Sequence, residues 1–346
     1  MAADKREVIR ALGRAKLPGA EQGAIAQGLV QDVVVDGDRV LVYVFDKVAD
    51  GRPIPAGWPA ALQQAVQAVS GVRQVSIEMR PAGTPPPTQA ARGRPRIQLS
   101  ETTAALAVAS GKGGVGKSTI AANLAVALAD LGHRVGALDA DIYGFSLPSL
   151  LGSRQAPEVT PERRILPTRA EGVQLMSMDY FVPGNKPVVW RGPMLGKALQ
   201  QFLQDVDWGE LDFLVLDLPP GTGDIALDVH EMLPECSELI VTTPDPLAAR
   251  VAVRAGQMAL TTSHPLLGVV ENMSYLPCER GPAHKPFGEG GGQAVAAELG
   301  VPLLAEVPLG SARRPGTGVF TKDSEAGRIF RALAEKIAES LGAAAD

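Results

Sequence analysis

Apolar and polar positions alternate with two different periods along the first eighty residues. The period-2 stretches predict strands at 29–35, 39–45 and 72–79, and helical spacing predicts helices at 6–12 and 59–69. The Asp-Gly-Asp turn at 36–38 joins the first two strands as a hairpin. This order of elements predicts a small α+β domain over residues 1–80.

From residue 101 onward, short apolar runs alternate with segments of helical spacing. The expected strands are 104–109, 134–138, 211–218, 238–243, 266–271 and 302–307, and the expected helices include 120–131, 246–260 and 324–341. Alternating strands and helices predict an α/β fold with a doubly wound, mostly parallel sheet, formed here by residues 101–346. Ligands of such sheets bind at the carboxyl ends of the strands.

Residues 81–100 differ from both neighbouring parts in composition. They contain five prolines, at positions 81, 85, 86, 87 and 95, and few apolar residues. Consecutive prolines stiffen a chain without folding it. We therefore expect a semi-rigid linker between the two domains.

Composition and charge narrow the class of protein. The 346 residues are 45% hydrophobic and carry a formal net charge of −5, which argues against a surface that coats nucleic acid. No apolar run in the sequence approaches the roughly 18 consecutive residues of a membrane helix, and the first twenty residues lack the apolar core of a signal peptide. Two cysteines fit a reducing compartment. We expect a cytoplasmic protein without membrane contact.

A phosphate-loop pattern stands between the first strand and the first helix of the larger domain. Its residues are Gly111, Lys112, Gly113, Gly114, Val115, Gly116, Lys117, Ser118 and Thr119. Glycines let consecutive backbone N–H groups turn toward an anion, and the helix N-terminus adds partial positive charge. Lys117 would then contact the β- and γ-phosphates, and the Ser118 hydroxyl would bind Mg²⁺. The alternative is a glycine-rich turn beside a surface lysine, but it does not explain why a strand precedes the turn and a helix follows it.

Aspartates follow two of the other expected strands. Asp217 ends the strand at 211–218, where a Walker B carboxylate would hold a magnesium-bound water. Asp139 and Asp141 are two residues apart and share a face of an extended chain. We assign Asp139 to the magnesium shell and Asp141 to orienting the attacking water. The alternative is that both are ordinary loop aspartates that cap turns.

Several further segments resemble the Mrp/ApbC family of iron–sulfur cluster carrier ATPases, which belongs to the ParA/MinD superfamily with its deviant Walker A loop. The resemblance rests on GKGGVGKS at 111–118, DADIYG at 139–144, WRGPM at 190–194, DLPPGTGD at 217–224, VENMSY at 270–275 and FGEGGG at 287–292. They cover residues 103–340 in the family's order. The first domain resembles the MIP18-like domain that precedes many such ATPases, without the cysteine and the Asp-Pro-Glu often found there.

This resemblance implies roles that the residue pattern alone does not. Lys112 would reach across a homodimer to the partner's nucleotide and act in hydrolysis together with Lys117 and Asp141. Asn272 would read the adenine edge. The protein would bind ATP and Mg²⁺, hydrolyse ATP slowly in the manner of a switch, and transfer iron–sulfur clusters to apo-proteins.

The cluster site is where the sequence departs from the family. A Cys-x-x-Cys pair from each of two subunits supplies the four thiolates of a bridging [4Fe–4S] cluster. Here Cys278 is followed by Gly281 in place of the second cysteine, and His284 is the nearest substitute ligand. The other cysteine, Cys236, precedes an apolar strand and reads as a small buried side chain.

Two other functions remain open on the sequence. The missing cysteine favours an ATP-gated dimeric scaffold of the ParA/MinD class that has lost cluster binding. Positioning on DNA or on a membrane is the third alternative, but the net charge and the balanced charges of the C-terminal helix argue against it.

Overall fold

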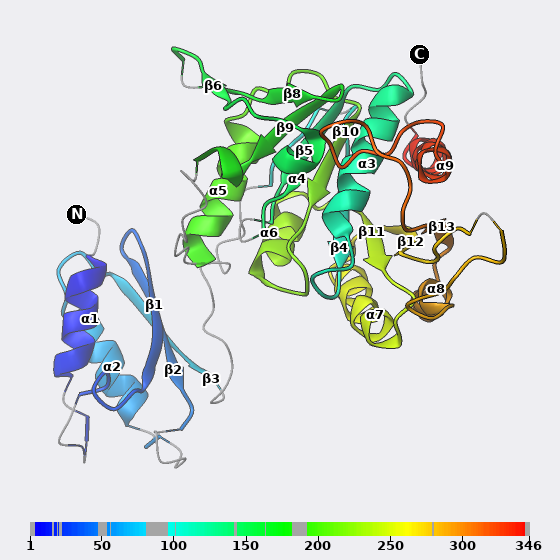
Figure 1. Cartoon of the computed structure of the whole chain (residues 1–346). Coiled ribbons are helices and arrows are strands. Elements are labelled where there is room, and N and C mark those ends of the chain that lie inside the picture. The colour runs from blue at the N-terminus through cyan, green and yellow to red at the C-terminus, as the bar shows by residue number, and fades with distance from the viewer. Residues whose placement is uncertain are drawn as a thin grey trace. The chain divides into compact units, whose positions relative to one another are not determined.

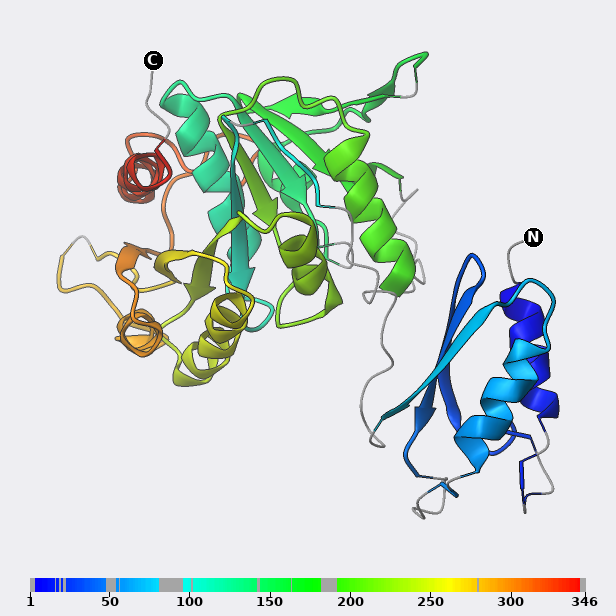
Figure 2. The same cartoon turned by 180° about the vertical axis from the view of Figure 1, so that it is seen from behind.

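The computed structural model divides the chain into two compact units, residues 1–93 and 94–346, which Figures 1 and 2 show from opposite sides. It describes residues 4–15, 17–18, 20, 23–47, 54–55, 57–80, 96–100, 102–141, 144–162, 164–181, 192–278 and 280–342. Most of the expected linker (81–95), Ile142, Tyr143, Trp190 and Arg191 lie outside these residues. Within them, no helix combines the length and the apolar character needed to cross a membrane.

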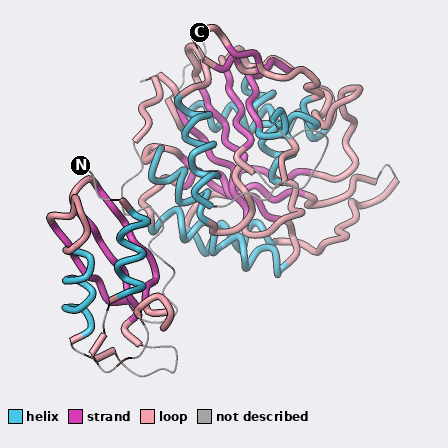
Figure 3. The backbone as a smooth tube through the Cα atoms, turned by 90° about the vertical axis from the view of Figure 1, so that its left-hand side faces the viewer, coloured by secondary structure: helices cyan, strands magenta, loops and turns pink. Residues whose placement is uncertain are grey.

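In its described residues, the smaller unit is a three-stranded sheet with two helices, and Figure 3 shows the helices beside the strands. Its elements are α1 (Lys5–Arg14), β1 (Val30–Asp36), β2 (Arg39–Phe45), α2 (Trp58–Gln67) and β3 (Gln74–Arg80). The strand order is β1-β2-β3, with β1 antiparallel and β3 parallel to β2. Val8 and Leu12 of α1 and Leu62 of α2 pack on this sheet in a core of its own.

The larger unit contains an eight-stranded sheet and seven helices among the described residues. Its strands are β4 (Ala104–Ser110), β5 (Val135–Asp139), β6 (Glu158–Val159), β7 (Ile165–Leu166), β8 (Thr168–Ala170), β9 (Val173–Ser177), β10 (Phe213–Asp217), β11 (Ser237–Thr242), β12 (Leu266–Asn272) and β13 (Leu303–Val307). Its helices are α3 (Lys117–Asp130), α4 (Leu147–Leu151), α5 (Gly192–Gln204), α6 (Asp224–Met232), α7 (Pro246–Thr261), α8 (Gly291–Leu299) and α9 (Glu325–Ser340).

The strand order of this sheet is β13-β12-β11-β4-β10-β5-β9-β8, and every pairing is parallel except that of β8 with β9. Successive residues of a strand face opposite sides, so Leu106 packs in one core and Ala107 in the other. Helices α3, α4 and α9 cover the first face, and α5, α6, α7 and α8 cover the second. The expected doubly wound, mostly parallel fold is confirmed.

The larger unit begins earlier in the chain than the composition suggests. Residues 96–100, the end of the expected linker, lie against the larger unit. The N–H of Ile97 donates to the carbonyl of Met232 at 2.8 Å, and the side chains of Ile97 and Leu99 pack against the larger unit's core.

Candidate functional site

Three strand ends meet in the middle of the large sheet. Strand β10 lies between β4 and β5, and its last residue, Asp217, is directly opposite Asp139 at the end of β5. The glycine-rich loop leaves the end of β4 on the other side of Asp217. The three segments that carry the expected phosphate and magnesium ligands therefore converge at one edge of the sheet.

The loop can adopt its shape only with glycine at certain positions. An added Cβ at Gly111 would lie 2.2 Å from the backbone of Val251 in α7, and Gly116 has a left-handed backbone with φ of 82°. The loop also borders an open space, which its own residues line. A cavity of about 420 Å³ opens there, lined by residues 112–119 together with Asp141, Gly144, Ser146, Ser149, Leu150 and Pro220.

Lys117 is the first residue of α3 and is only 6% exposed. Its ammonium Nζ lies 2.5 Å from Oδ1 of Asp217 and 3.8 Å from Oδ2 of Asp141. It also lies 3.4 Å from the hydroxyl of Ser118. The structure thus brings together the lysine, the hydroxyl and two of the three carboxylates that the sequence singles out.

Asp139 is fully buried, and the protein's own donors surround it. Its Oδ2 accepts from the N–H groups of Ser146 and Leu147 at 2.9 and 3.1 Å and from the Ser177 hydroxyl at 3.3 Å. Burial, reinforced by the charge of Asp217, raises the pKa of Asp139 to about 7. In this arrangement Asp139 supports the start of α4, next to the cavity wall.

The donor set fits a magnesium ion shared with a nucleotide. Burial raises the pKa of Asp217, the Lys117 ammonium opposes that shift, and the second carboxylate oxygen, Oδ2, has no hydrogen-bond partner. Among the described residues no group of three or more His, Cys, Asp or Glu side chains could hold a metal by itself. Mg²⁺ commonly binds through one or two protein ligands and completes its shell with water and substrate phosphates.

The segment after Asp217 runs beside the phosphate loop. The N–H of Gly221 donates to the carbonyl of Ser110 at 2.8 Å, and an added Cβ at Gly113 would lie 3.9 Å from the ring of Pro220. In the sequence this segment is part of DLPPGTGD at 217–224, one of the segments that carry the resemblance to the family. The sequence did not indicate Ser146, Ser149 and Leu150 as cavity residues, because they lie just after DADIYG in a stretch that carries no motif of its own.

Lys112, the additional lysine, forms an ion pair with a residue next to α7. It is 43% exposed, and its Nζ lies 3.3 Å from Oδ1 of Asp245, the N-cap residue of α7. The N–H of Ala248, and after it Lys112, hold the pKa of Asp245 below its usual value. The sequence predicts the helix at 246–260 that Asp245 caps, but not the ion pair of Asp245 with Lys112.

Asn272, at the end of β12, contacts the phosphate loop directly. Its amide Nδ2 donates to the carbonyl of Val115 at 2.9 Å, and its Oδ1 accepts from the N–H of Met273. The residue is buried, and its amide fills the space that a Cβ on Gly116 would need. Asn272 therefore helps to shape the loop.

Cys278 lies on an exposed hairpin. The backbones of Leu276 and His284 pair in both directions, at 2.8 and 2.9 Å, and the cysteine lies between them. An added Cβ at Gly281 would be 3.8 Å from Sγ of Cys278. The second cysteine, Cys236, is buried, and burial raises the pKa of its thiol far above the usual value. It reads as a packing residue, in agreement with the sequence.

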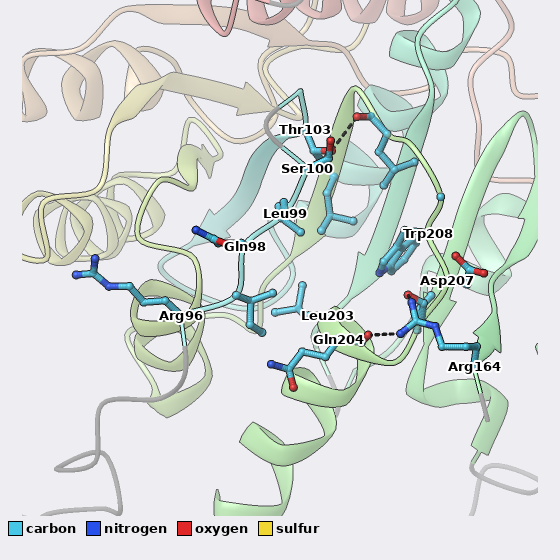
Figure 4. A pocket seen from close by; sticks show the side chains of 15 residues that line it. Arg96, Gln98, Leu99, Ser100, Thr103, Arg164, Leu203, Gln204, Asp207 and Trp208 are labelled. Carbon is cyan, nitrogen blue, oxygen red and sulfur yellow. Dashed lines mark hydrogen bonds between the residues drawn. The ribbon is translucent and has the colours of Figure 1, made fainter. Parts of the chain in front are cut away.

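A second cavity, of about 680 Å³, lies at the opposite ends of β4 and β10 (Figure 4). Three of its polar side chains bond to the protein's own carbonyls: Thr103 donates to that of Leu211, Arg164 to that of Gln204, and Trp208 to that of Phe202. None of the candidate residues named above is among the residues that line this cavity. The phosphate-loop cavity is the better site.

Comparison with known proteins agrees with this geometry. A family model described as NUBPL iron-transfer P-loop NTPase, of the ParA group, matches residues 101–338. The iron-sulfur cluster carrier protein of Bacillus subtilis is 42% identical over 345 residues, 96% of each chain. That of Mycobacterium leprae is 43% identical over 88% of this chain and 83% of its own.

Two solved structures share the fold of the larger unit. The nucleotide-binding protein of Archaeoglobus fulgidus in complex with ADP is 34% identical, with a TM-score of 0.53 over 68% of this chain and 88% of its own. The septum site-determining protein MinD of Pyrococcus horikoshii, complexed with Mg-ADP, is 26% identical, with a TM-score of 0.51 over 69% of this chain and 98% of its own.

Proposed function

The chain belongs to the ParA/NUBPL family of iron-transfer P-loop NTPases, and we propose that it is an ATP-hydrolysing iron–sulfur cluster carrier acting as a homodimer. The observation that carries the proposal is that Lys117, at the cavity beside the phosphate loop, contacts both Asp141 and Asp217. Relatives along most of the chain are named iron-sulfur cluster carrier proteins. Apo iron–sulfur proteins are the clients that this function requires.

The chain's own residues position the nucleotide. The N–H groups of residues 113–118 and the N-terminus of α3 bind the phosphates, and Lys117 leaves Asp217 to contact the β- and γ-phosphates. Asp141, at the cavity wall, orients the attacking water. Asn272 holds the loop through the carbonyl of Val115, and we assign the contact with the adenine edge to the same amide.

Magnesium would be held by the Ser118 hydroxyl and, through water, by the free oxygen of Asp217. It would neutralise phosphate charge that develops during hydrolysis. Asp139 keeps the β5–α4 loop in place and contributes its negative charge from a buried position.

Lys112 completes the site in a dimer. In one chain by itself, Lys112 lines the rim of the cavity and its ammonium group is paired with Asp245. Reaching a partner's phosphates requires that this exposed ion pair opens, at a cost of about 1 kcal/mol or less. An ATP-bound dimer readily supplies that energy.

The cargo side of the proposal rests on Cys278. It is exposed on a hairpin with two partly exposed apolar side chains nearby in sequence, Leu276 and Phe287, as expected for a surface that meets other proteins. Each subunit offers one thiolate there, so a bridging cluster would have two protein thiolates and further ligands from thiols or imidazoles.

Anaerobic reconstitution tests the carrier function. With iron, sulfide and a thiol, the protein should take up about four iron and four sulfide per dimer, or two of each for the smaller cluster, and pass them to an apo-ferredoxin. Cys278→Ala should abolish uptake, and Cys236→Ala should not. Uptake that is unchanged in Cys278→Ala would contradict the assignment.

The second candidate is an ATP-gated scaffold without cargo. Gly281 favours it, because each subunit lacks the second thiolate of a chelating pair. A protein that hydrolyses ATP but gains no cluster absorbance in the reconstitution would be of this kind.

A further inference from the structure

Glu271, the residue before Asn272, has no part in the mechanism above although it is a charged side chain only 2% exposed. It stands at the base of the Cys278 loop, which we define as residues 273–278 and 280–290 between β12 and α8. One carboxylate oxygen, Oε1, accepts from the hydroxyl of Ser274 at the start of this loop. The other, Oε2, accepts from the N–H of Gly292 at 2.5 Å, in the first turn of α8 just after the loop ends.

One buried carboxylate therefore accepts hydrogen bonds from residues at both ends of the Cys278 loop. The contact with α8 is close: an added Cβ at Gly292 would lie 2.7 Å from Cβ of Glu271, and one at Gly291 would lie 2.6 Å from the carbonyl of Thr243. This explains the glycine run of the FGEGGG segment, which phosphate binding does not use. A carboxylate at a helix N-terminus is also favoured by the helix dipole.

The next two residues, Asn272 and Met273, contact the phosphate loop. Asn272 donates to the carbonyl of Val115, and Met273 has a left-handed backbone, with φ of 57°, that is strained for a non-glycine residue. The methyl Cε of Met273 lies 3.6 Å from the position of a Cβ on Gly116. The strained turn is thus packed against the loop that receives the nucleotide.

We propose that Glu271 and Asn272 are positioning residues that couple the phosphate loop to the Cys278 loop. Nucleotide binding moves the Val115 carbonyl, Asn272 follows it, and Glu271 passes the displacement to both ends of the Cys278 loop. The path is short, because Cys278 is only six positions after Asn272 in the sequence. Coupling of this kind requires that the contacts differ between the free and the bound state. The inference rests on the proposed function, which supplies the nucleotide and the thiol.

The test is the rate at which Cys278 is alkylated in the full-length, cluster-free protein. Cys236 is 1% exposed, and the sequence contains no third cysteine, so iodoacetamide labels Cys278 in the native state. The rate is measured by intact mass without nucleotide and with a non-hydrolysable Mg-ATP analogue. In the wild type we expect the two rates to differ by about fivefold or more.

Variants of the anchor separate coupling from folding. Glu271→Ala should bring the ratio of the two rates close to one, while affinity for a fluorescent ATP analogue stays within about threefold of the wild type. Glu271→Gln should restore the ratio, because an amide can accept from Gly292 and donate to Ser274. If Glu271→Ala does not fold, Ser274→Ala decides, since it removes only the bond at the start of the loop and should lower the ratio by about half or more.

A wild-type ratio near one, or an unchanged ratio in folded Glu271→Ala or in Ser274→Ala, would overturn the coupling. Absence of nucleotide binding in the wild type would instead overturn the proposed function. The two failures are therefore distinguishable.

Discussion

Lys117 and Asp217 form a buried ion pair through Oδ1 of Asp217, and the other carboxylate oxygen, Oδ2, has no hydrogen-bond partner. The sequence identified both residues, because a glycine-rich loop and an acidic strand end each have a local signature. The sequence could not show that Asp139 accepts hydrogen bonds from Ser146, Leu147 and Ser177, since these contacts depend on how the β5–α4 loop folds back. The contact of Asn272 with Val115 joins residues 157 positions apart and was equally invisible.

Lys112 provides the sharpest prediction at the residue scale. Lys112→Ala should lower the rate of ATP hydrolysis by about a hundredfold or more, as loss of a charge that acts on the transition state does, and leave ATP binding within about threefold. The control is Lys322→Ala, another exposed lysine in an ion pair, with Asp130. Steady-state phosphate release and equilibrium binding measure the two effects. Normal turnover in the Lys112 variant would exclude its action across the dimer.

Gly281→Cys tests the incomplete cluster site. A cysteine at 281 places its Cβ 3.8 Å from Sγ of Cys278 and gives each subunit a chelating pair. We expect the variant to retain cluster through desalting in thiol-free buffer, where the wild type loses most of it. Iron and sulfide content measure this, with Gly281→Ser as the control for the added side chain. Equal retention by all three proteins would show that residue 281 does not face the cluster.

At the scale of elements, helices with a long periodic segment were predictable and shorter ones were not. Helices α3, α7 and α9 have 14, 16 and 16 residues and follow from their helical spacing. Helices α5, α6 and α8 were missed; they have 13, 9 and 9 residues, so their periodicity is less distinct. Strands β8 and β9 have three and five residues, too few for periodicity to stand out.

The packing of α7 on the phosphate loop gives a prediction with a matched control. Gly111→Ala places a Cβ 2.2 Å from the backbone of Val251, whereas Gly113→Ala meets only the Pro220 ring at 3.9 Å. Gly111→Ala should destabilise the larger unit by about 1–3 kcal/mol and weaken ATP binding about tenfold or more. Gly113→Ala should change stability by only about 0.5 kcal/mol. Urea unfolding and nucleotide titration measure both; equal effects would contradict the close packing at residue 111.

At the scale of the whole molecule, the smaller unit has a hydrophobic core separate from the two cores of the larger unit, and a proline-rich stretch joins the units in the sequence, which explains why composition alone suggested two parts. The larger part carries three buried carboxylates at or beside its site, Asp139, Asp141 and Asp217, and one buried lysine, Lys117. This excess of negative charge makes the stability of the nucleotide-free protein depend on pH.

The sign of that dependence follows from Asp139. Its pKa is about 7 when folded and about 4 when unfolded, so its favourable contribution is complete below pH 4 and is lost as the pH rises to 7. We expect Asp139→Asn to flatten the pH dependence of the unfolding free energy over this range, and the exposed Asp323→Asn to leave it unchanged. Urea titrations at several pH values test this. A wild-type slope retained in Asp139→Asn would contradict the assignment.

The central claim is that the cavity beside the phosphate loop binds Mg-ATP through Lys117. Isothermal titration calorimetry of Mg-ATP into the full-length protein tests it most directly. We predict a saturable heat of binding in the wild type that is absent in Lys117→Ala and retained in Lys112→Ala. No heat in a folded wild-type protein, or equal binding by Lys117→Ala, would contradict the account.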